Sequence, residues 1–571
     1  MNITSTRFTS AAALAAAILT SSAGSALAQP NSPVPRPPGG MRFQGTAGFI
    51  DYDRGVAPST LPLAPLVMFS GQQMETPEAL QDGEIQGRAV EINWALLDAV
   101  DLGTTTSCTL PLINGQMREL AFVRKETFGE NRYVWYGQIA GIPASDFILS
   151  RYDDAVVLQV RDYDRKETFM VRFAPATAEQ PNRSVLVQLG DNQDAGWCGT
   201  GSGAASLPPP APGDGGDGGI DEGGQGGGGG VGIMSAADPT NVVDVLFLTT
   251  PQFRSLFGNV DSQVNARSQL LVSDFNLTTA NSGAGVVMRI AGVLNTGYSE
   301  TASGHDDLAN LALARNGLGA TPSLRDMVRA DHVVLLRATK WPNPDGAGNI
   351  LGVAYRPSTL DGATASTGYS VVSAEGNQAN TFTHEIGHNF GACHDAAQPG
   401  CTSAVTASPH GKRWSCNRVA CTDHWHTTMA YGNNENACSP STRVPFFSNP
   451  ALTYTTPFGC SNFVLGDSIS NVANVIQTTR SRVSQWSVGS SRQWTLSTYG
   501  GTGNGTYFAP FNRVAQAVGA VQGGSTDGQV FISSGVYSET AAAGRSVVLT
   551  NPCVMTVVAG PASGSGPAIL R

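Results

Sequence analysis

One twelve-residue segment constrains the fold of this chain more than any other feature. Residues 384–395 read His-Glu-Ile-Gly-His-Asn-Phe-Gly-Ala-Cys-His-Asp. On an α-helix, at about 100° per residue, His384 and His388 lie about 40° apart on one face. The roughly opposite face carries apolar side chains, namely Phe382, Ile386 and Phe390. The segment therefore predicts a helix whose apolar face packs into a core while its histidine face borders a site.

The residues after this helix complete a metal-binding pattern. Gly391 can adopt the positive φ that ends a helix, and the turn brings His394 toward the first two histidines. Three neutral imidazoles suit one tetrahedral Zn²⁺ whose fourth position is left to water, which the metal makes a nucleophile. Glu385 points elsewhere on the helix and suits the general base that takes the proton of that water. A purely structural zinc is the alternative, but such sites usually have four protein ligands. We therefore expect a catalytic zinc bound by His384, His388 and His394.

The beginning of the chain has the pattern of an export signal. Arg7 precedes the apolar residues 11–19, and Ala26-Leu27-Ala28 is a small-residue cleavage site. We expect a signal peptide over 1–28, cleaved after Ala28, and secretion into an oxidising extracellular compartment. No later run reaches the roughly 18 apolar residues of a membrane span. The net charge of −10, without any Lys/Arg run, argues against a nucleic-acid partner.

The full chain has 571 residues, and composition divides the part after the signal peptide into several domains. Residues 29–198 form a β-rich region in which β-prone runs alternate with polar turns, the pattern of an antiparallel meander. Its clearest runs are 133–136, 147–149, 156–160 and 169–173. Residues 199–237 are a Gly/Pro-rich linker open to proteolysis. The spacing of the aspartates in the linker fits no calcium loop, so a structural Ca²⁺ has no motif to support it.

From residue 238 the pattern changes to alternating strands and helices, which predicts an α/β (α+β) domain over 238–488. A helix is expected around Val260, Val264, Leu271 and Phe275. The expected strands are 242–249, 286–294, 332–337, 350–355 and 369–373, and further helices are expected over 306–316, 324–330 and 471–486. Residues 494–571 are predicted to be a small β-rich accessory module. Runs at 503–506, 510–514 and 528–532 resemble the start of a parallel β-helix.

The extended histidine motif and the strand–helix order before it resemble the metzincin metalloendopeptidases. The resemblance covers about residues 238–487 and implies a twisted mixed sheet beside the zinc-binding helix. It also implies that Glu385 is catalytic, that Gly391 makes the turn, and that Met429 lies beneath the zinc. Asp395, directly after the third histidine, is typical of the reprolysin (adamalysin) branch. The segment 445–450 and the closing helix are similar to bacterial peptidyl-Asp metalloendopeptidases, which implies cleavage beside acidic residues.

Two further residues have alternative interpretations. In astacins a tyrosine at the offset of Tyr431 from Met429 approaches the zinc, so Tyr431 is either an oxyanion stabiliser or a packed tyrosine. Cys198, at the end of the β-rich region, is either a latency switch that occupies the open zinc position or a disulfide partner of Cys108. Pairing with Cys553 is a further possibility. Six cysteines between 393 and 460 permit three disulfides whose connectivity stays open.

The leading hypothesis is a secreted zinc metalloendopeptidase that acts on protein or peptide substrates and is made as a zymogen. Residues 29–198 are then a propeptide that inhibits the enzyme until the linker is cut. The alternative is a secreted binding or adhesion protein with a vestigial protease domain. The intact motif, with Glu385 and all three histidines, favours the enzyme.

Overall fold

The computed structural model describes most of the chain between Ile50 and Val557. The described residues are 50, 56–60, 62–75, 80–81, 84–101, 106–129, 131–174, 183–190, 197–198, 241–343, 349–375, 378–398, 401, 405–417, 421–432, 437–438, 441–454, 463–486, 492–495, 510–517, 528–532, 535–538, 546–549 and 553–557. The expected signal peptide and the expected linker lie outside these residues.

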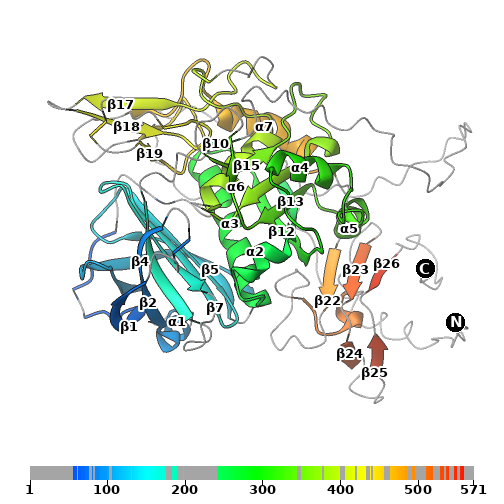
Figure 1. Cartoon of the computed structure of the whole chain (residues 1–571), viewed down its shortest axis with the longest axis horizontal. Coiled ribbons are helices and arrows are strands. Elements are labelled where there is room, and N and C mark those ends of the chain that lie inside the picture. Colours follow the sequence, from blue (N-terminus) through cyan, green and yellow to red (C-terminus); the bar gives the residue numbers. More distant parts are fainter. Residues whose placement is uncertain are drawn as a thin grey trace, which may run out of the picture. The chain divides into compact units, whose positions relative to one another are not determined.

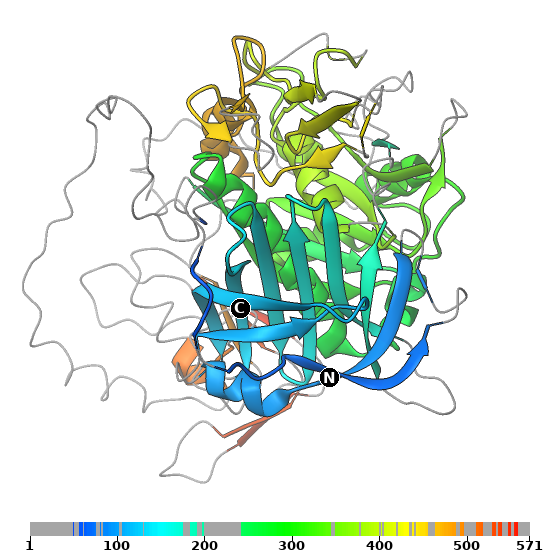
Figure 2. The same ribbon diagram turned by 90° about the vertical axis from the view of Figure 1, so that its left-hand side faces the viewer.

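A nine-stranded sheet occupies the β-rich region, and all its strand pairs are antiparallel (Figures 1 and 2). The order is β1-β2-β9-β8-β7-β6-β5-β4-β3, so β4 to β9 form the meander that the alternating runs predict. The bounds are β1 Val67–Met74, β2 Glu84–Ile92, β3 Ser107–Pro111, β4 Met117–Gly129, β5 Arg132–Ile139, β6 Ser145–Tyr152, β7 Ala155–Asp162, β8 Glu167–Ala174 and β9 Arg183–Leu189. Helix α1, Trp94–Asp101, follows β2.

This N-terminal sheet is buried on both faces. Along β5, Tyr133 and Trp135 join an apolar cluster within the sheet's own domain. The alternate residues Val134 and Tyr136 join a second cluster, which extends to Leu270 in the region after the linker. Because successive side chains of a strand point to opposite faces, each face of this sheet covers a different core.

The region after the linker contains a second, mixed sheet. Strands β11, β12, β13 and β16 are parallel, β15 is antiparallel to β16, and the order is β10-β15-β16-β13-β11-β12 with β14 on β15. The bounds are β10 Trp197–Cys198, β11 Val242–Thr249, β12 Val287–Asn295, β13 His332–Arg337, β14 Trp341–Pro342, β15 Asn349–Ala354 and β16 Tyr369–Ser373. The helices are α2 Pro251–Ser255, α3 Asp261–Asn281, α4 Gly304–Ala312, α5 Thr321–Val328, α6 Gln378–Asn389 and α7 Val472–Val483, with a 3-10 turn at Ala365–Thr367.

The mixed sheet also has a core on each face. On β11, Val245 and Phe247 join the cluster that contains the apolar face of α6. Leu246 and Leu248 join the opposite cluster, with residues of α4. The predicted apolar face of α6 is correct, since Phe382, Ile386 and Phe390 are fully buried in the first cluster.

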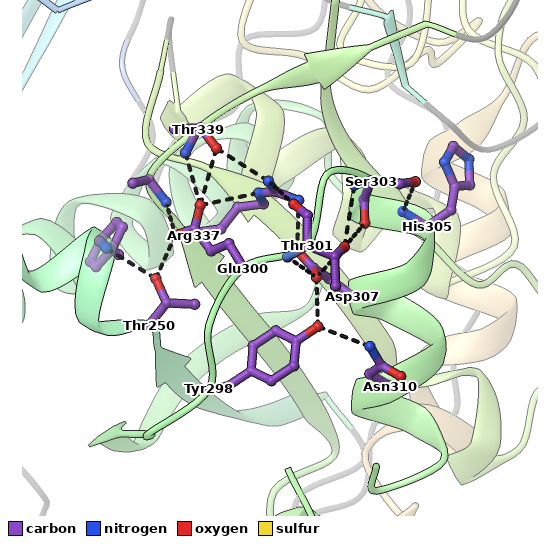
Figure 3. A network of polar contacts seen from close by, with 12 residues as sticks. Thr250, Tyr298, Glu300, Thr301, Ser303, His305, Asp307, Asn310, Arg337 and Thr339 are labelled. Carbon is purple, nitrogen blue, oxygen red and sulfur yellow. Dashed lines mark hydrogen bonds and ion pairs between the residues drawn. The ribbon is translucent and has the colours of Figure 1, made fainter. Parts of the chain in front are cut away.

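A polar network fixes α4 to the ends of β11 and β13 (Figure 3). Arg337, at the end of β13, donates from Nη1 to Asp307 Oδ2 of α4 at 2.6 Å. Asp307 Oδ1 accepts from the Tyr298 hydroxyl at 2.6 Å and from Thr301 Oγ1 at 2.7 Å. Both charged groups are buried, so the ion pair needs these additional hydrogen bonds to offset its desolvation. The network holds the segment after β12 in place against the sheet.

Short strands follow α6 in the chain. They are β17 Arg413–Asn417, β18 Thr422–His426, β19 Thr442–Arg443, β20 Thr453–Tyr454 and β21 Phe463–Val464. Disulfides Cys393–Cys401 and Cys421–Cys438 lie in this region, and Cys416 is also disulfide-bonded. None of the helices in the described residues combines the length and apolar content that crossing a bilayer requires.

The described residues of the C-terminal module form short strands. Its strands are β22 Arg492–Thr495, β23 Gly528–Ile532, β24 Gly535–Ser538, β25 Ser546–Leu549 and β26 Cys553–Val557. Only the pair β22–β23 is parallel among those described; β23–β26 and β24–β25 are antiparallel. Thr495 of β22 also forms a parallel bridge with Phe511, so two of the three predicted runs pair in parallel with β22, and the β-helix stays a prediction.

Candidate active site

The three histidines of the motif converge. His384 and His388 lie one turn apart on α6, and their Nε2 atoms are 3.1 Å apart. The Nε2 atom of His394 lies 3.0 Å from that of His388. All three side chains are buried. The structure therefore brings together the three predicted zinc ligands.

Hydrogen bonds to the backbone fix the tautomers of the two helical histidines. His384 Nδ1 donates to the Thr428 carbonyl at 2.8 Å, and His388 Nδ1 donates to the Ala392 carbonyl at 2.8 Å. Each Nε2 is then an unprotonated acceptor that faces other ring nitrogens. Acceptors in such contact need a cation between them, so this donor set fits Zn²⁺.

Burial keeps these imidazoles neutral. It lowers the pKa of His388 to about 3, and it lowers the pKa of His384 and His394 well below the ordinary value. The neighbouring imidazoles and the positive charge of Arg443 lower the pKa of His384 and His394 further. Neutral imidazole is the form that binds a metal, so the site is ready for zinc at neutral pH.

The turn to the third histidine follows the predicted geometry. Helix α6 ends at Asn389, and Gly391 has a φ of +100°. A Cβ at this position would also lie 2.6 Å from Val405 Cγ2, so both backbone and space favour glycine. The carbonyl of His394 accepts from His410 Nδ1 at 2.8 Å. His410 thus supports the third ligand from outside the ligand set.

Glu385 is fully buried beside β15. A Cβ built on Gly352 would lie 2.5 Å from Glu385 Oε1 and 2.7 Å from its Cγ. Glycine at position 352 therefore leaves the space that the glutamate side chain occupies. The sequence motif identifies Glu385, but it gives no sign that a glycine 33 residues earlier makes room for it.

Met429 packs against the backbone of the ligand helix α6. Its side chain is fully buried, and a Cβ on Gly387 would overlap its sulfur atom. Gly387 stands between the two helical histidines in α6. The absence of a side chain there lets Met429 and Phe447 approach the helix backbone. Met429 is next to Thr428, whose carbonyl orients His384.

Asp395 joins the third histidine to the segment that carries Met429. Its Oδ2 accepts from the Tyr431 backbone N–H at 3.2 Å, and its Oδ1 pairs with Arg413 Nη2 at 2.7 Å. The Tyr431 hydroxyl lies 3.1 Å from His394 Nε2, so this tyrosine reaches the metal site. Sequence reasoning missed Arg413, because only the fold brings β17 to Asp395.

A short strand from before the linker pairs with β15. In β10, Trp197 is in register with Ile350 and Cys198 with Gly352, in parallel orientation. The backbone of Cys198 is thus opposite the glycine that borders Glu385. Cys108, by contrast, is a free and buried thiol whose pKa burial raises to about 12. The alternative of a Cys108–Cys198 disulfide is therefore wrong for this structure.

The other histidines of the region have local roles. His424 Nδ1 lies 2.9 Å from Ser415 Oγ, and His426 Nδ1 lies 2.9 Å from Ser441 Oγ.

Asn389, the last residue of α6, was missed by the sequence reasoning. Its side-chain amide donates to the carbonyls of Tyr355 at 2.9 Å and Thr367 at 2.8 Å. It ties the end of the ligand helix to the segments that flank β15 and β16.

Comparisons with known proteins agree with this site. The family model Reprolysin_5, described as metallo-peptidase family M12, matches residues 239–441. A peptidyl-Asp metalloendopeptidase of Xanthomonas campestris pv. campestris is 29% identical over 409 residues, 71% of this chain and 82% of the relative. One of Stenotrophomonas maltophilia (strain K279a) is 26% identical over 345 residues, 58% of this chain and 72% of the relative. The solved metalloproteinase-II from Bacteroides fragilis aligns at 13% identity with a TM-score of 0.30, over 55% of this chain and 90% of that one, a likeness too weak to bear on the fold.

The site and the matches together identify a metzincin-like zinc metalloendopeptidase. Within that class, the matched region is a reprolysin-like domain of metallo-peptidase family M12. The resemblance drawn from the motif is thereby confirmed.

Proposed function

We propose that this enzyme is a secreted endopeptidase, made as a zymogen, in which Glu385 is the general base. The observation that carries the proposal is the convergence of three Nε2 atoms beside a buried glutamate. His384, His388 and His394 would hold the zinc, which supplies a polarised water and a Lewis acid when bound. The export pattern at 1–28 supports secretion.

The roles of the chain's own residues follow from their positions. The side chain of Glu385, a residue of α6, lies beside Gly352. It takes a proton from the attacking water and returns that proton to the leaving amine. The carbonyls of Thr428 and Ala392 keep two of the imidazoles in the metal-binding tautomer. Tyr431 donates a hydrogen bond from its hydroxyl to the oxyanion that develops on the scissile carbonyl. Met429 forms the apolar base of the site.

Latency is proposed to arise from the segment that carries β10. Its pairing with β15 supports this role, because an edge strand is where an extended peptide substrate adds to a sheet. The thiolate of Cys198 is proposed as the ligand that takes the open zinc position. A Cys198→Ser proenzyme with an uncut linker should then digest peptides, whereas the parent proenzyme should not.

The substrate preference is proposed from the relatives, whose name indicates peptidyl-Asp bonds. Arg443 supports it, because β19 places this residue in register with His426, two residues before Thr428, whose carbonyl accepts from His384. A positive charge at this place complements an acidic side chain of the substrate. The preference is tested by kcat/KM for matched peptides that differ only in Asp or Asn beside the scissile bond.

The enzyme itself is tested by digestion of a peptide library with and without a chelator. Mass spectrometry of the secreted form gives its N-terminus, and the library gives the cleavage site. Activity that disappears with chelator and returns with Zn²⁺ is expected. Zinc-loaded protein that cleaves nothing would instead favour a binding or adhesion protein.

A further inference from the structure

Helix α3 belongs to the metallopeptidase domain, yet it is buried on both of its long sides. Leu271 and Phe275 join the core beneath the active-site helix α6. Ala266 and Leu270 join the cluster that includes alternate residues of the N-terminal sheet, namely Val134, Tyr136, Ile148 and Val157. Polar residues of α3 are buried as well, among them Asn265, Arg267, Gln269 and Asp274. A helix that is buried all round lies between two cores rather than at a surface.

A buried ion pair connects the sheet to α3 and on to α6. Arg161 of β7 donates from Nη1 to Asp274 Oδ1 at 2.5 Å and from Nε to Asp146 Oδ1 at 2.6 Å. Asp274 Oδ2 accepts from Thr383 Oγ1 of α6 at 2.8 Å. Arg161 and Asp274 are only 4% and 1% exposed. The cation that neutralises a carboxylate under the active-site helix is therefore supplied by the N-terminal sheet.

Two other cations extend this contact. Arg267 of α3 donates to Gln378 Oε1 of α6 at 2.7 Å and lies 3.0 Å from Met170 Sδ of β8. Lys166, in the turn before β8, lies 3.3 Å from Asp423 Oδ1 of β18 and over the ring of Trp425. The contact surface therefore includes α3 and the hairpin β17–β18.

Separation of the sheet would leave this surface in an unfavourable state. The apolar cluster would be exposed to water, and Asp274 would lose the cation that Arg161 provides. A propeptide that only blocks an active site needs no such buried charge beneath the catalytic helix. We propose that α3 and the hairpin β17–β18 are a docking surface for the chain's own N-terminal sheet. The sheet remains bound there as a separate polypeptide after the linker is cut.

The inference rests on the proposed zymogen function only in assuming that the linker is cut during maturation. The test uses the full chain in a Glu385→Gln background, which prevents self-digestion. A recognition sequence for a site-specific protease is placed within 199–237, and complete cutting is verified on a denaturing gel. On size-exclusion chromatography the two fragments are expected to co-elute in equal amounts. Separate peaks, or precipitation of one fragment, would overturn the proposal.

Arg161→Met in the same background tests the buried ion pair. The dissociation constant of the two fragments is measured by co-elution over a dilution series. It is expected to rise at least about 30-fold in this variant, because the substitution leaves buried carboxylates without their cation. Arg165→Met is the matched control: Arg165 is exposed and bonds to Gln116 within the sheet, so the dissociation constant should not change.

Adding Asp274→Asn to Arg161→Met removes one of the stranded charges. The double variant should therefore bind more tightly than Arg161→Met alone. Equal weakening by Arg161→Met and Arg165→Met would contradict the role of the ion pair. If Arg161→Met does not fold, the cut parent still decides the proposal. The co-elution measurement does not depend on peptidase activity. A failure of the proposed peptidase function would therefore be seen in a different experiment, as zinc-loaded parent protein that does not cleave peptides.

Discussion

Gly387→Ala probes the contact between the ligand helix and the residue beneath the zinc. The added Cβ would overlap the Met429 sulfur and lie 3.2 Å from Phe447 Cε1. Both neighbours are fully buried, so neither can move into solvent. Overpacking of this kind costs about 1–3 kcal/mol, while replacing glycine by alanine within a helix gains about 1 kcal/mol. We expect a net loss of about 0–2 kcal/mol in the free energy of unfolding.

A double-mutant cycle isolates that contact. In a Met429→Ala background the sulfur is absent, so Gly387→Ala should retain mainly its helix-propensity gain. The two substitutions should then be coupled by about 1–3 kcal/mol. The assay is chemical denaturation of the four proteins in a Glu385→Gln background with saturating zinc. Effects that add to within about 0.5 kcal/mol would refute the steric reasoning.

Three further substitutions test individual parts of the site. His388→Ala should lose zinc and activity together, and full zinc occupancy by atomic emission would mean that the ligand assignment is wrong. Met429→Leu should keep most activity and cost under about 1.5 kcal/mol, because it nearly conserves volume; loss of zinc in this variant would contradict a packing role. Gly352→Ala should retain zinc but lower kcat about 10²-fold, since its Cβ displaces Glu385; unchanged kcat with a crystallographically unmoved glutamate would argue against this.

Much of the site could be predicted because its information is local. The histidine spacing and Gly391 predict the helix, its end and the ligand set from helix geometry alone. Apolar periodicity also gave the strands 332–337 and 369–373 with the bounds that the structure has. Each of these features is determined by residues close to one another in the sequence.

The remainder depends on contacts between distant segments. The apolar spacing of α3 predicted a helix, but its buried Arg267 and Asp274 gave no sign of a second core, because the covering sheet precedes the linker. The space for Glu385 comes from a glycine on another element. The glycine-rich β-prone runs of the C-terminal module do not specify whether their partners are parallel, and the structure has both kinds of pair there.

The central claim, that Glu385 is the base of a zinc peptidase, is tested most directly by Glu385→Gln. Glu375→Gln is the matched control, since Glu375 lies just before α6 and pairs with Lys340 at 3.6 Å, apart from the ligand set. Zinc content and peptide turnover are measured on the same preparations after removal of the inhibitory segment. The account predicts parental zinc in both variants, near-parental turnover in Glu375→Gln, and turnover lowered about 10²–10⁴-fold in Glu385→Gln. Near-parental turnover by zinc-loaded Glu385→Gln would contradict it.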